Sequence, residues 1–247
     1  MSRIATLGLV IAVLLLAACS GDSYSELQRA SGRGQTDIVQ VMLNRGADVN
    51  ETNREGKTPL MLAAANGRPD TVRLLLGREA NVDAQDTDGM TALMVAASGG
   101  YTECVNLLLD HGADINLTNE YGATAITNAV FFGHEETARA LLAHEDKVDS
   151  EDADEALLIA AGLGHNGIIE ALLDHGADID TRGKNKRTPL MAAAAFGHDD
   201  TAELLVKRGA DLDALDSNGQ SALQVAESEG EGRIAAMLRK AGARVVQ

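Results

Sequence analysis

Histidine is the residue in this sequence best suited to metal binding or acid–base catalysis, and it occurs six times. A zinc site needs three or four such ligands that converge on one point. Here the histidines instead recur 31 or 33 residues apart in two series. We therefore expect them to occupy equivalent places in repeated segments, with no metal site and no catalytic role. The two series are His134, His165 and His198, and His111, His144 and His175.

Carboxylates are concentrated in the segment Glu145–Glu155, which holds seven of them and one lysine. A calcium-binding loop places oxygen ligands at alternating positions and a glycine at its sharp turn. Asp149, Glu151, Asp152 and Asp154 meet this pattern only in part. We interpret the segment as a solvated loop between repeats, and cation binding is the alternative.

No other pattern in the chain predicts catalysis. The sequence has no nucleophile elbow, no phosphate-binding loop and no paired zinc motif. Cys104 occupies the position that threonine occupies in neighbouring repeats, at Thr71 and Thr137, and this favours a small packing residue. We therefore expect a protein that is not an enzyme and that binds no cofactor.

The composition excludes two further classes of protein. The 247 residues include 37 Asp and Glu against 21 Lys and Arg, which gives a formal net charge of −16. Nucleic-acid binding depends on cationic side chains that neutralise phosphates, so we expect no nucleic-acid partner. The two cysteines cannot form a disulfide framework. Apolar residues, at 45% of the chain, suffice for a folded core.

The first 19 residues have the pattern of a secretory leader. Arg3 precedes an uncharged, mostly apolar run of 15 residues, shorter than the roughly 20 that a membrane-spanning helix needs. The run ends in Leu16-Ala17-Ala18-Cys19, which resembles a bacterial lipobox. This resemblance implies a signal peptide over residues 1–18 that is cleaved before Cys19, and lipidation of Cys19. The alternative is an ordinary signal peptide with an accidental cysteine.

The residue after the cysteine bears on where such a lipoprotein resides. Ser20 follows Cys19, and no aspartate does. This resembles sorting to the outer membrane of the bacterial cell envelope, on its periplasmic face, rather than retention at the inner membrane. Residues 19–23 form the lipid anchor and a short tether, since the five residues from Ser20 to Tyr24 reach about 15–18 Å at full extension. We therefore expect the folded part to lie close to the membrane.

The rest of the chain is one segment repeated about every 33 residues. Two motifs alternate along it: a Gly-Ala-Asp sequence and a Thr-Pro-Leu-Met sequence. Together they resemble the ankyrin repeat over residues 24–247, which implies an all-α repeat solenoid of about seven helix–turn–helix units with β-turn fingers, and a monomer. The motifs include Gly46-Ala47-Asp48, Gly112-Ala113-Asp114, Gly176-Ala177-Asp178 and Gly209-Ala210-Asp211, and Thr58-Pro59-Leu60-Met61 and Thr188-Pro189-Leu190-Met191.

Local sequence signals agree with the resemblance. Thr58 is suited to cap a helix, and Pro59 to occupy its first turn, where a missing N–H costs nothing. Glycines such as Gly112 are suited to the left-handed conformation that follows a helix. Where this glycine is due, the second repeat has Glu79, and we expect the loop there to relax out of the left-handed conformation. The fourth repeat has Glu145 at the same place.

The fifth and the terminal repeats depart from the pattern. The fifth is two residues short and lacks the Thr-Pro start, so we expect either a bend in the stack or a rebuilt finger. Gln28, Arg29 and Arg33 on the opening helix, and Arg239 in a column that is otherwise apolar, indicate that the first and last repeats are caps.

Ankyrin stacks bind partners on a concave surface of fingers and first helices, and the resemblance implies the same here. Phe132, Leu163 and Phe196 form one row across the expected surface, with Phe131 and Tyr121 nearby. Such an apolar cluster favours a protein-binding site, although the rings are alternatively half-buried against neighbouring helices. The basic cluster Lys184, Lys186 and Arg187 either orients the partner or pairs with the acidic segment.

The expected function is therefore a non-catalytic protein-binding module that is lipid-anchored at Cys19 in the bacterial envelope. Bacterial ankyrin proteins that this chain resembles include immunity proteins that inhibit a secreted toxic effector. Others are accessory proteins for a periplasmic catalase or peroxide defence. A purely structural envelope tether is a further alternative, and the sequence does not choose among them.

Overall fold

The structure is a computed structural model that describes residues 24–144 and 149–244. The expected signal peptide, Cys19 and tether lie outside the described residues, as does the start of the acidic segment at 145–148. Within the described ranges, fourteen α-helices form seven consecutive pairs and no strand occurs. This confirms the predicted all-α repeat fold.

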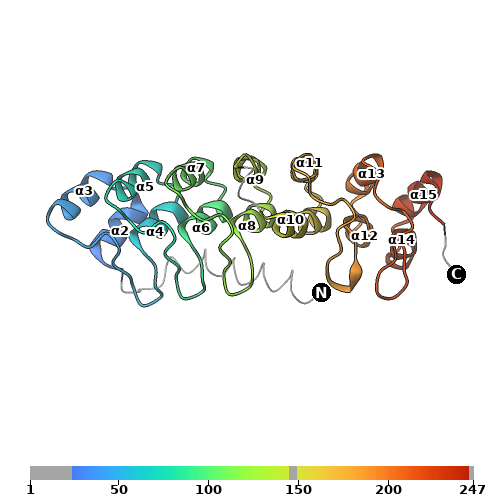
Figure 1. The fold of residues 1–247 in the computed structure, drawn as a ribbon, viewed down its shortest axis with the longest axis horizontal. Coiled ribbons are helices and arrows are strands. Elements are labelled where there is room, and N and C mark those ends of the chain that lie inside the picture. The colour runs from blue at the N-terminus through green and yellow to red at the C-terminus, as the bar shows by residue number, and fades with distance from the viewer. Residues whose placement is uncertain (1–23, 145–148, 245–247) are drawn as a thin grey trace. The chain divides into compact units, whose positions relative to one another are not determined.

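The chain divides into two compact units, 1–128 and 129–247, with the division inside α8 (Ala125–Phe131). In each unit the first helices of the pairs form one layer and the second helices another (Figure 1). The first unit contains α2 (Glu26–Arg33), α3 (Thr36–Asn44), α4 (Pro59–Ala65), α5 (Pro69–Leu76), α6 (Ala92–Ser98) and α7 (Thr102–Asp110). The second contains α9 (Glu135–Leu142), α10 (Ser150–Leu163), α11 (Asn166–Asp174), the 3₁₀ turn η2 (Lys184–Lys186), α12 (Pro189–Ala195), α13 (Asp199–Lys207), α14 (Ala222–Glu229) and α15 (Gly232–Ala241).

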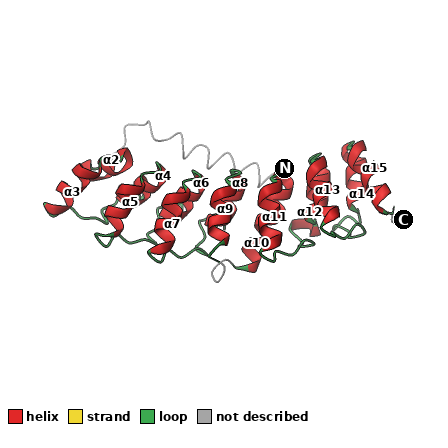
Figure 2. Ribbon diagram, turned by 90° about the horizontal axis from the view of Figure 1, so that it is seen from above, coloured by secondary structure: helices red, strands yellow, loops and turns green. Residues whose placement is uncertain are grey.

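Successive pairs pack side by side within each unit. In the first unit α4 lies between α2 and α6, and α5 lies between α3 and α7, as Figure 2 shows. In the second unit α12 lies between α10 and α14, and α11 lies between α9 and α13. Fully buried alanines, such as Ala63 and Ala193, allow neighbouring first helices to approach closely. Each pair therefore buries its apolar side chains against the next pair.

The first helices begin where the sequence predicts. The Thr58 hydroxyl accepts a hydrogen bond from the backbone N–H of Met61 (3.2 Å), and Thr188 does the same for Met191 (3.3 Å). Pro59 opens α4 and Pro69 opens α5, in the first turn that tolerates proline. These caps are local, so the sequence around each cap determines where its helix begins.

The prediction for Glu79 was wrong. Its φ is 63°, so the loop keeps the left-handed conformation that Gly112 adopts at the equivalent place (φ 83°). The same two backbone hydrogen bonds close the helix before Glu79 and the helix before Gly112. Glu79 N–H donates to Leu76 O, and the N–H of the following residue donates to the carbonyl oxygen of the residue before Leu76. Retaining these bonds outweighs a left-handed cost of roughly 1–2 kcal/mol for a residue with a Cβ atom.

The interpretation of the acidic segment as a loop was also wrong for the part the structure describes. Residues 150–155 form the first turns of α10, which has 14 residues where α12 has seven. Glu151 lies in the first turn, where the helix dipole favours negative charge. Ala153, Ala156 and Leu157 are buried at helical spacing. The fifth repeat has thus replaced its finger with additional helix.

The polar residues expected to cap the stack have different environments in the first and the last repeat. Gln28, expected at the surface of the first cap, is buried and donates from Nε2 to the Lys57 backbone oxygen (2.8 Å). Arg29 and Arg33 are exposed as expected. At the other end, Arg239 is exposed and forms an ion pair with Glu227. A charged residue ends the apolar column there, as a cap requires.

Candidate functional site

Four of the fingers that precede first helices are closed by the same side-chain hydrogen bonds. The side chain of an Asp or Asn accepts hydrogen bonds from the backbone N–H groups two and four residues later, which closes a tight turn. In the last finger, Asp216 Oδ1 accepts from Asn218 N (2.8 Å) and Gln220 N (3.0 Å). Asn119 makes the equivalent bonds to Tyr121 N and Ala123 N, both at 2.9 Å.

A second contact joins neighbouring fingers at three places. The residue just before the helix-capping Thr faces the turn Asp or Asn of the following finger. Where the turn residue is Asp, the side chain that faces it is a cation. Lys57 faces Asp86 in this way, and Arg187 faces Asp216. Where the turn residue is Asn, as at Asn119, its amide donates a hydrogen bond to the sulfur of Met90 (3.2 Å). Arg187 therefore contacts the next finger of the stack.

The basic finger 183–187 is built differently from its neighbours. Gly183 replaces the turn Asp or Asn, and a Cβ atom there would lie 2.9 Å from Cδ1 of Leu158 on the lengthened α10. Asn185 and Lys186 adopt left-handed backbone conformations, at φ 60° and 57°. Lys184 and Lys186 are exposed, and neither forms an ion pair within the residues that the structure describes. These two lysines thus present positive charge to solvent that no described residue pairs.

The predicted apolar row lies in the second unit, at the ends of first helices. Phe196 follows α12 and is 58% exposed, and its ring lies over Gly162 of α10. Leu163, the last residue of α10, is half-buried. Phe132 is half-buried, packs edge-on against Phe131 with ring centroids 5.2 Å apart, and stacks on His134. The row therefore combines one open ring with partly covered apolar neighbours.

The first unit has exposed aromatic residues of its own, outside the row of Phe132, Leu163 and Phe196. Tyr121, another predicted contact residue, lies in the turn of the 119–123 finger and is 50% exposed. Tyr101, which sequence reasoning missed, is 37% exposed. Its ring lies where Cβ atoms on Gly67 or Gly99 would approach within 2.6 Å. The two glycines were the sequence signal that could have identified Tyr101, because a ring packs so closely only on residues that lack a side chain.

The histidines occupy the repeated places predicted for them. His165 and His198 precede second helices and pack against Gly133 and Gly164 of the preceding turn. His198 Nε2 donates to the Gly162 oxygen (3.0 Å). Burial, together with the nearby His198, lowers the pKa of His165. His111 and His175 end second helices, and each donates from Nδ1 to the carbonyl four residues earlier (2.8 Å).

The described part of the acidic segment and Cys104 make structural contacts. No group of three or more His, Cys, Asp or Glu side chains among the described residues converges to hold a metal ion. Asp154 instead accepts a hydrogen bond from the Asp178 backbone N–H (2.7 Å). Cys104 is buried, and this burial raises the pKa of its thiol to about 11.

The comparisons with known proteins agree with this architecture. A family model for ankyrin repeats matches residues 27–119, 114–183 and 157–247. This chain belongs to the ankyrin-repeat family, whose domains are generally protein–protein interaction modules and typically non-catalytic. No curated protein sequence matches the chain. Among the described residues, no helix has both the length and the apolarity needed to cross a bilayer.

Two solved structures illustrate the similarity. The human ASB11 ankyrin repeat domain is 28% identical, with a TM-score of 0.79, and the match covers 90% of this chain and 100% of that one. The ankyrin repeat domain of Bcl-3, described as a unique member of the IkappaB protein family, is also 28% identical. Its TM-score is 0.76, and the match covers 88% of this chain and 99% of that one.

Proposed function

We propose that this chain is a non-catalytic protein-binding module of the bacterial envelope, lipid-anchored at Cys19. Its second unit binds a protein partner through Phe132, Leu163 and Phe196, with Lys184 and Lys186 at the edge of the contact. The observation that carries this proposal is Phe196, a phenylalanine 58% exposed to water at the end of a first helix. Large exposed rings beside other apolar residues are typical of interaction sites.

The chemistry of the surface restricts the partner. The apolar row favours a partner with an apolar side chain that fits between Phe196 and its neighbours. Lys184 and Lys186 are exposed cations in a chain of net charge −16. Complementary charge contributes mainly to association rate and orientation. The proposal therefore specifies a protein that presents an apolar anchor next to a carboxylate.

The anchoring part of the proposal rests on the sequence alone. The lipobox-like Leu16-Ala17-Ala18-Cys19 supports cleavage and lipidation, and Ser20 supports the outer membrane. Several acyl chains on one cysteine hold a protein to a bilayer far more firmly than one chain does. A mass measurement of the mature chain isolated from cells tests this directly. Lipidated Cys19 as the first residue is the expected result, and an unmodified cysteine contradicts it.

The binding proposal is tested by affinity capture from envelope extract, using the chain from residue 20. We expect one saturable partner for the wild type and its loss with Phe132→Ala, Leu163→Ala and Phe196→Ala combined. The matched control is Ile38→Ala with Val41→Ala, which removes exposed apolar groups from the first unit. Circular dichroism checks that each variant is folded. An identical capture by all three proteins contradicts the proposal and favours the tether.

A further inference from the structure

The first repeat exposes an apolar face that every later repeat covers. Ile38 on α3 is 48% exposed. The equivalent residues in the six later repeats are at most 1% exposed, because the preceding repeat packs on them. These covered residues are Thr71, Cys104, Thr137, Ile168, Thr201 and Ile234. A repeat that ends a stack in water needs a polar face there, so an isoleucine at this place is unexpected.

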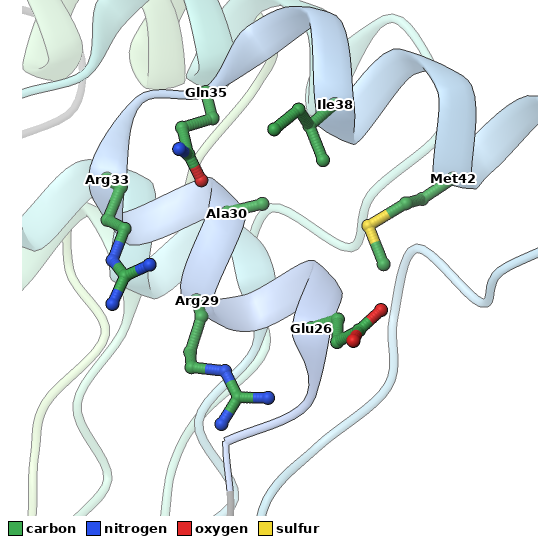
Figure 3. A pocket seen from close by; sticks show the side chains of 7 residues that line it. All are labelled: Glu26, Arg29, Ala30, Arg33, Gln35, Ile38 and Met42. Atoms are coloured by element: carbon green, nitrogen blue, oxygen red, sulfur yellow. The ribbon is translucent and has the colours of Figure 1, made fainter.

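The surroundings of Ile38 extend the apolar face. Val41, one turn further along α3, is 45% exposed, and Met42 is half-buried beside it. Figure 3 shows Ile38 and Met42 projecting from α3 toward α2, with Arg29 and Arg33 on α2 along the edge. We call Glu26, Arg29, Arg33, Ile38, Val41 and Met42 the N-terminal face. All of these residues except Val41 line a shallow hollow of about 240 Å³, together with Ala30 and Gln35.

The charge of this face differs from that of the chain as a whole. Residues 24–45 hold three arginines against Glu26 and Asp37, a formal charge of 3 − 2 = +1, whereas the whole chain carries −16. Exposed aliphatic side chains flanked by arginines are the combination that lies at a bilayer surface, where lipid phosphates pair with the guanidinium groups. The last repeat, in contrast, ends in the ion pair of Arg239 with Glu227.

The position of the face along the chain points to the same surface. Helix α2 begins at Glu26, close after Cys19. The five residues from Ser20 to Tyr24 span at most about 15–18 Å, so a lipid on Cys19 holds the first repeat at the membrane. We propose that the N-terminal face lies on the lipid surface, with Ile38 and Val41 among the acyl chains and Arg29 and Arg33 at the phosphates. This inference rests on the proposed lipidation of Cys19.

A second copy of the chain is the competing occupant of this face. A stable protein–protein interface buries about 1,200–2,000 Å² in total. The apolar side chains of this face, Ile38, Val41 and Met42, all come from one nine-residue helix, which is small for that purpose. A surface held by an anchor needs far less area, because the tether makes the contact intramolecular and raises its effective concentration. The observations therefore favour lipid over a second copy.

The test uses the full lipidated chain in vesicles of phosphatidylethanolamine and phosphatidylglycerol. A fluorescent probe that is quenched by brominated lipid is attached through Val41→Cys, and in a separate protein through Lys240→Cys on α15. Cys104 stays unlabelled because it is 1% exposed. The face is disrupted by Ile38→Glu with Arg33→Glu. The control, Gln40→Glu with Asn44→Glu, adds two acids to the same helix outside the N-terminal face.

The expected result is vesicle flotation, with quenching at position 41 several-fold stronger than at position 240. The face variant abolishes this difference, and the control retains it. Flotation without quenching at position 41 overturns the inference while the anchor remains. Energy transfer between probes on two chains, without lipid quenching, overturns it in favour of a second copy. Failure to float removes the anchor proposal and this inference together.

Discussion

Arg187 Nε lies 3.7 Å from Asp216 Oδ2, between one finger of the second unit and the next. The Asp216 side chain is fully buried, and its Oδ2 has no hydrogen-bond partner among the described residues. The guanidinium is thus the charge that compensates a buried carboxylate. Arg187 was predicted from the sequence as a partner-binding residue, and its geometry gives it a second role in holding adjacent fingers together.

Replacing Arg187 with methionine is expected to lower the free energy of unfolding by about 1–3 kcal/mol, because the buried Asp216 carboxylate loses the cation of its ion pair. The double change Arg187→Met with Asp216→Asn is expected to recover most of this loss, since it recreates the Met90–Asn119 contact. Urea unfolding of the wild type, both single variants and the double variant measures the coupling. Additive single effects would show that the two residues do not interact.

Glu79→Gly is expected to raise the free energy of unfolding by about 1 kcal/mol, because glycine removes the left-handed strain at φ 63°. The reciprocal control is Gly112→Ala, where a Cβ atom meets nothing within 4 Å and only the backbone is strained. This variant is expected to lose about 1 kcal/mol. Thermal unfolding of both proteins checks the pair, and a destabilised Glu79→Gly variant would mean that the glutamate side chain stabilises the loop.

Asp152→Asn is expected to stabilise the protein at neutral pH. Burial, together with Asp149, Glu155 and Glu151, raises the pKa of Asp152 to about 6 from 3.8. The folded state therefore holds this proton more tightly than the unfolded state. The penalty is full above pH 6 and is relieved as the pH falls from about 6 toward 3.8. Melting temperatures from pH 8 to pH 5 should converge for the two proteins, and a constant difference would contradict the shift.

Cys104 is expected to be unreactive in the folded protein. Its thiol has a pKa of about 11 and is 1% exposed, so little thiolate forms at pH 8 and reagents do not reach it. A disulfide reagent should modify Cys104 at the rate of unfolding, and rapidly in urea. The chain from residue 20 is the suitable sample because it lacks Cys19. Rapid native modification would place Cys104 at an accessible surface.

Local features of the fold were predictable from the sequence, and long-range ones were not. The starts of α4 and α12 follow from Thr58 and Thr188, because a cap depends on residues three positions apart. The start of α10 was missed, because the repeat register predicted a finger where Ala153, Ala156 and Leu157 bury a helical face. Glu79 was missed because hydrogen bonds around the loop outweigh its own preference.

In the candidate site, too, the positions of single residues were predictable from the sequence, and contacts between fingers were not. The exposed ring of Phe196 and the exposed lysines of the 183–187 finger occupy the predicted repeat positions. The pairing of Arg187 with Asp216 could not be predicted, because the two residues lie on adjacent fingers and their contact depends on the stack. The half-burial of Phe132 was one of the two predicted alternatives, and its ring packs on Phe131 and His134 of its own repeat. Their role in binding remains a prediction.

The most direct test of partner binding is photo-crosslinking in living cells, with a photoreactive phenylalanine at position 196. The same residue at position 101, an exposed tyrosine of the first unit, is the matched control. The account predicts one discrete protein adduct at position 196 that is absent at position 101 and lost when Lys184 and Lys186 are changed to glutamate. No adduct at position 196, or the same adducts at both positions, would contradict it.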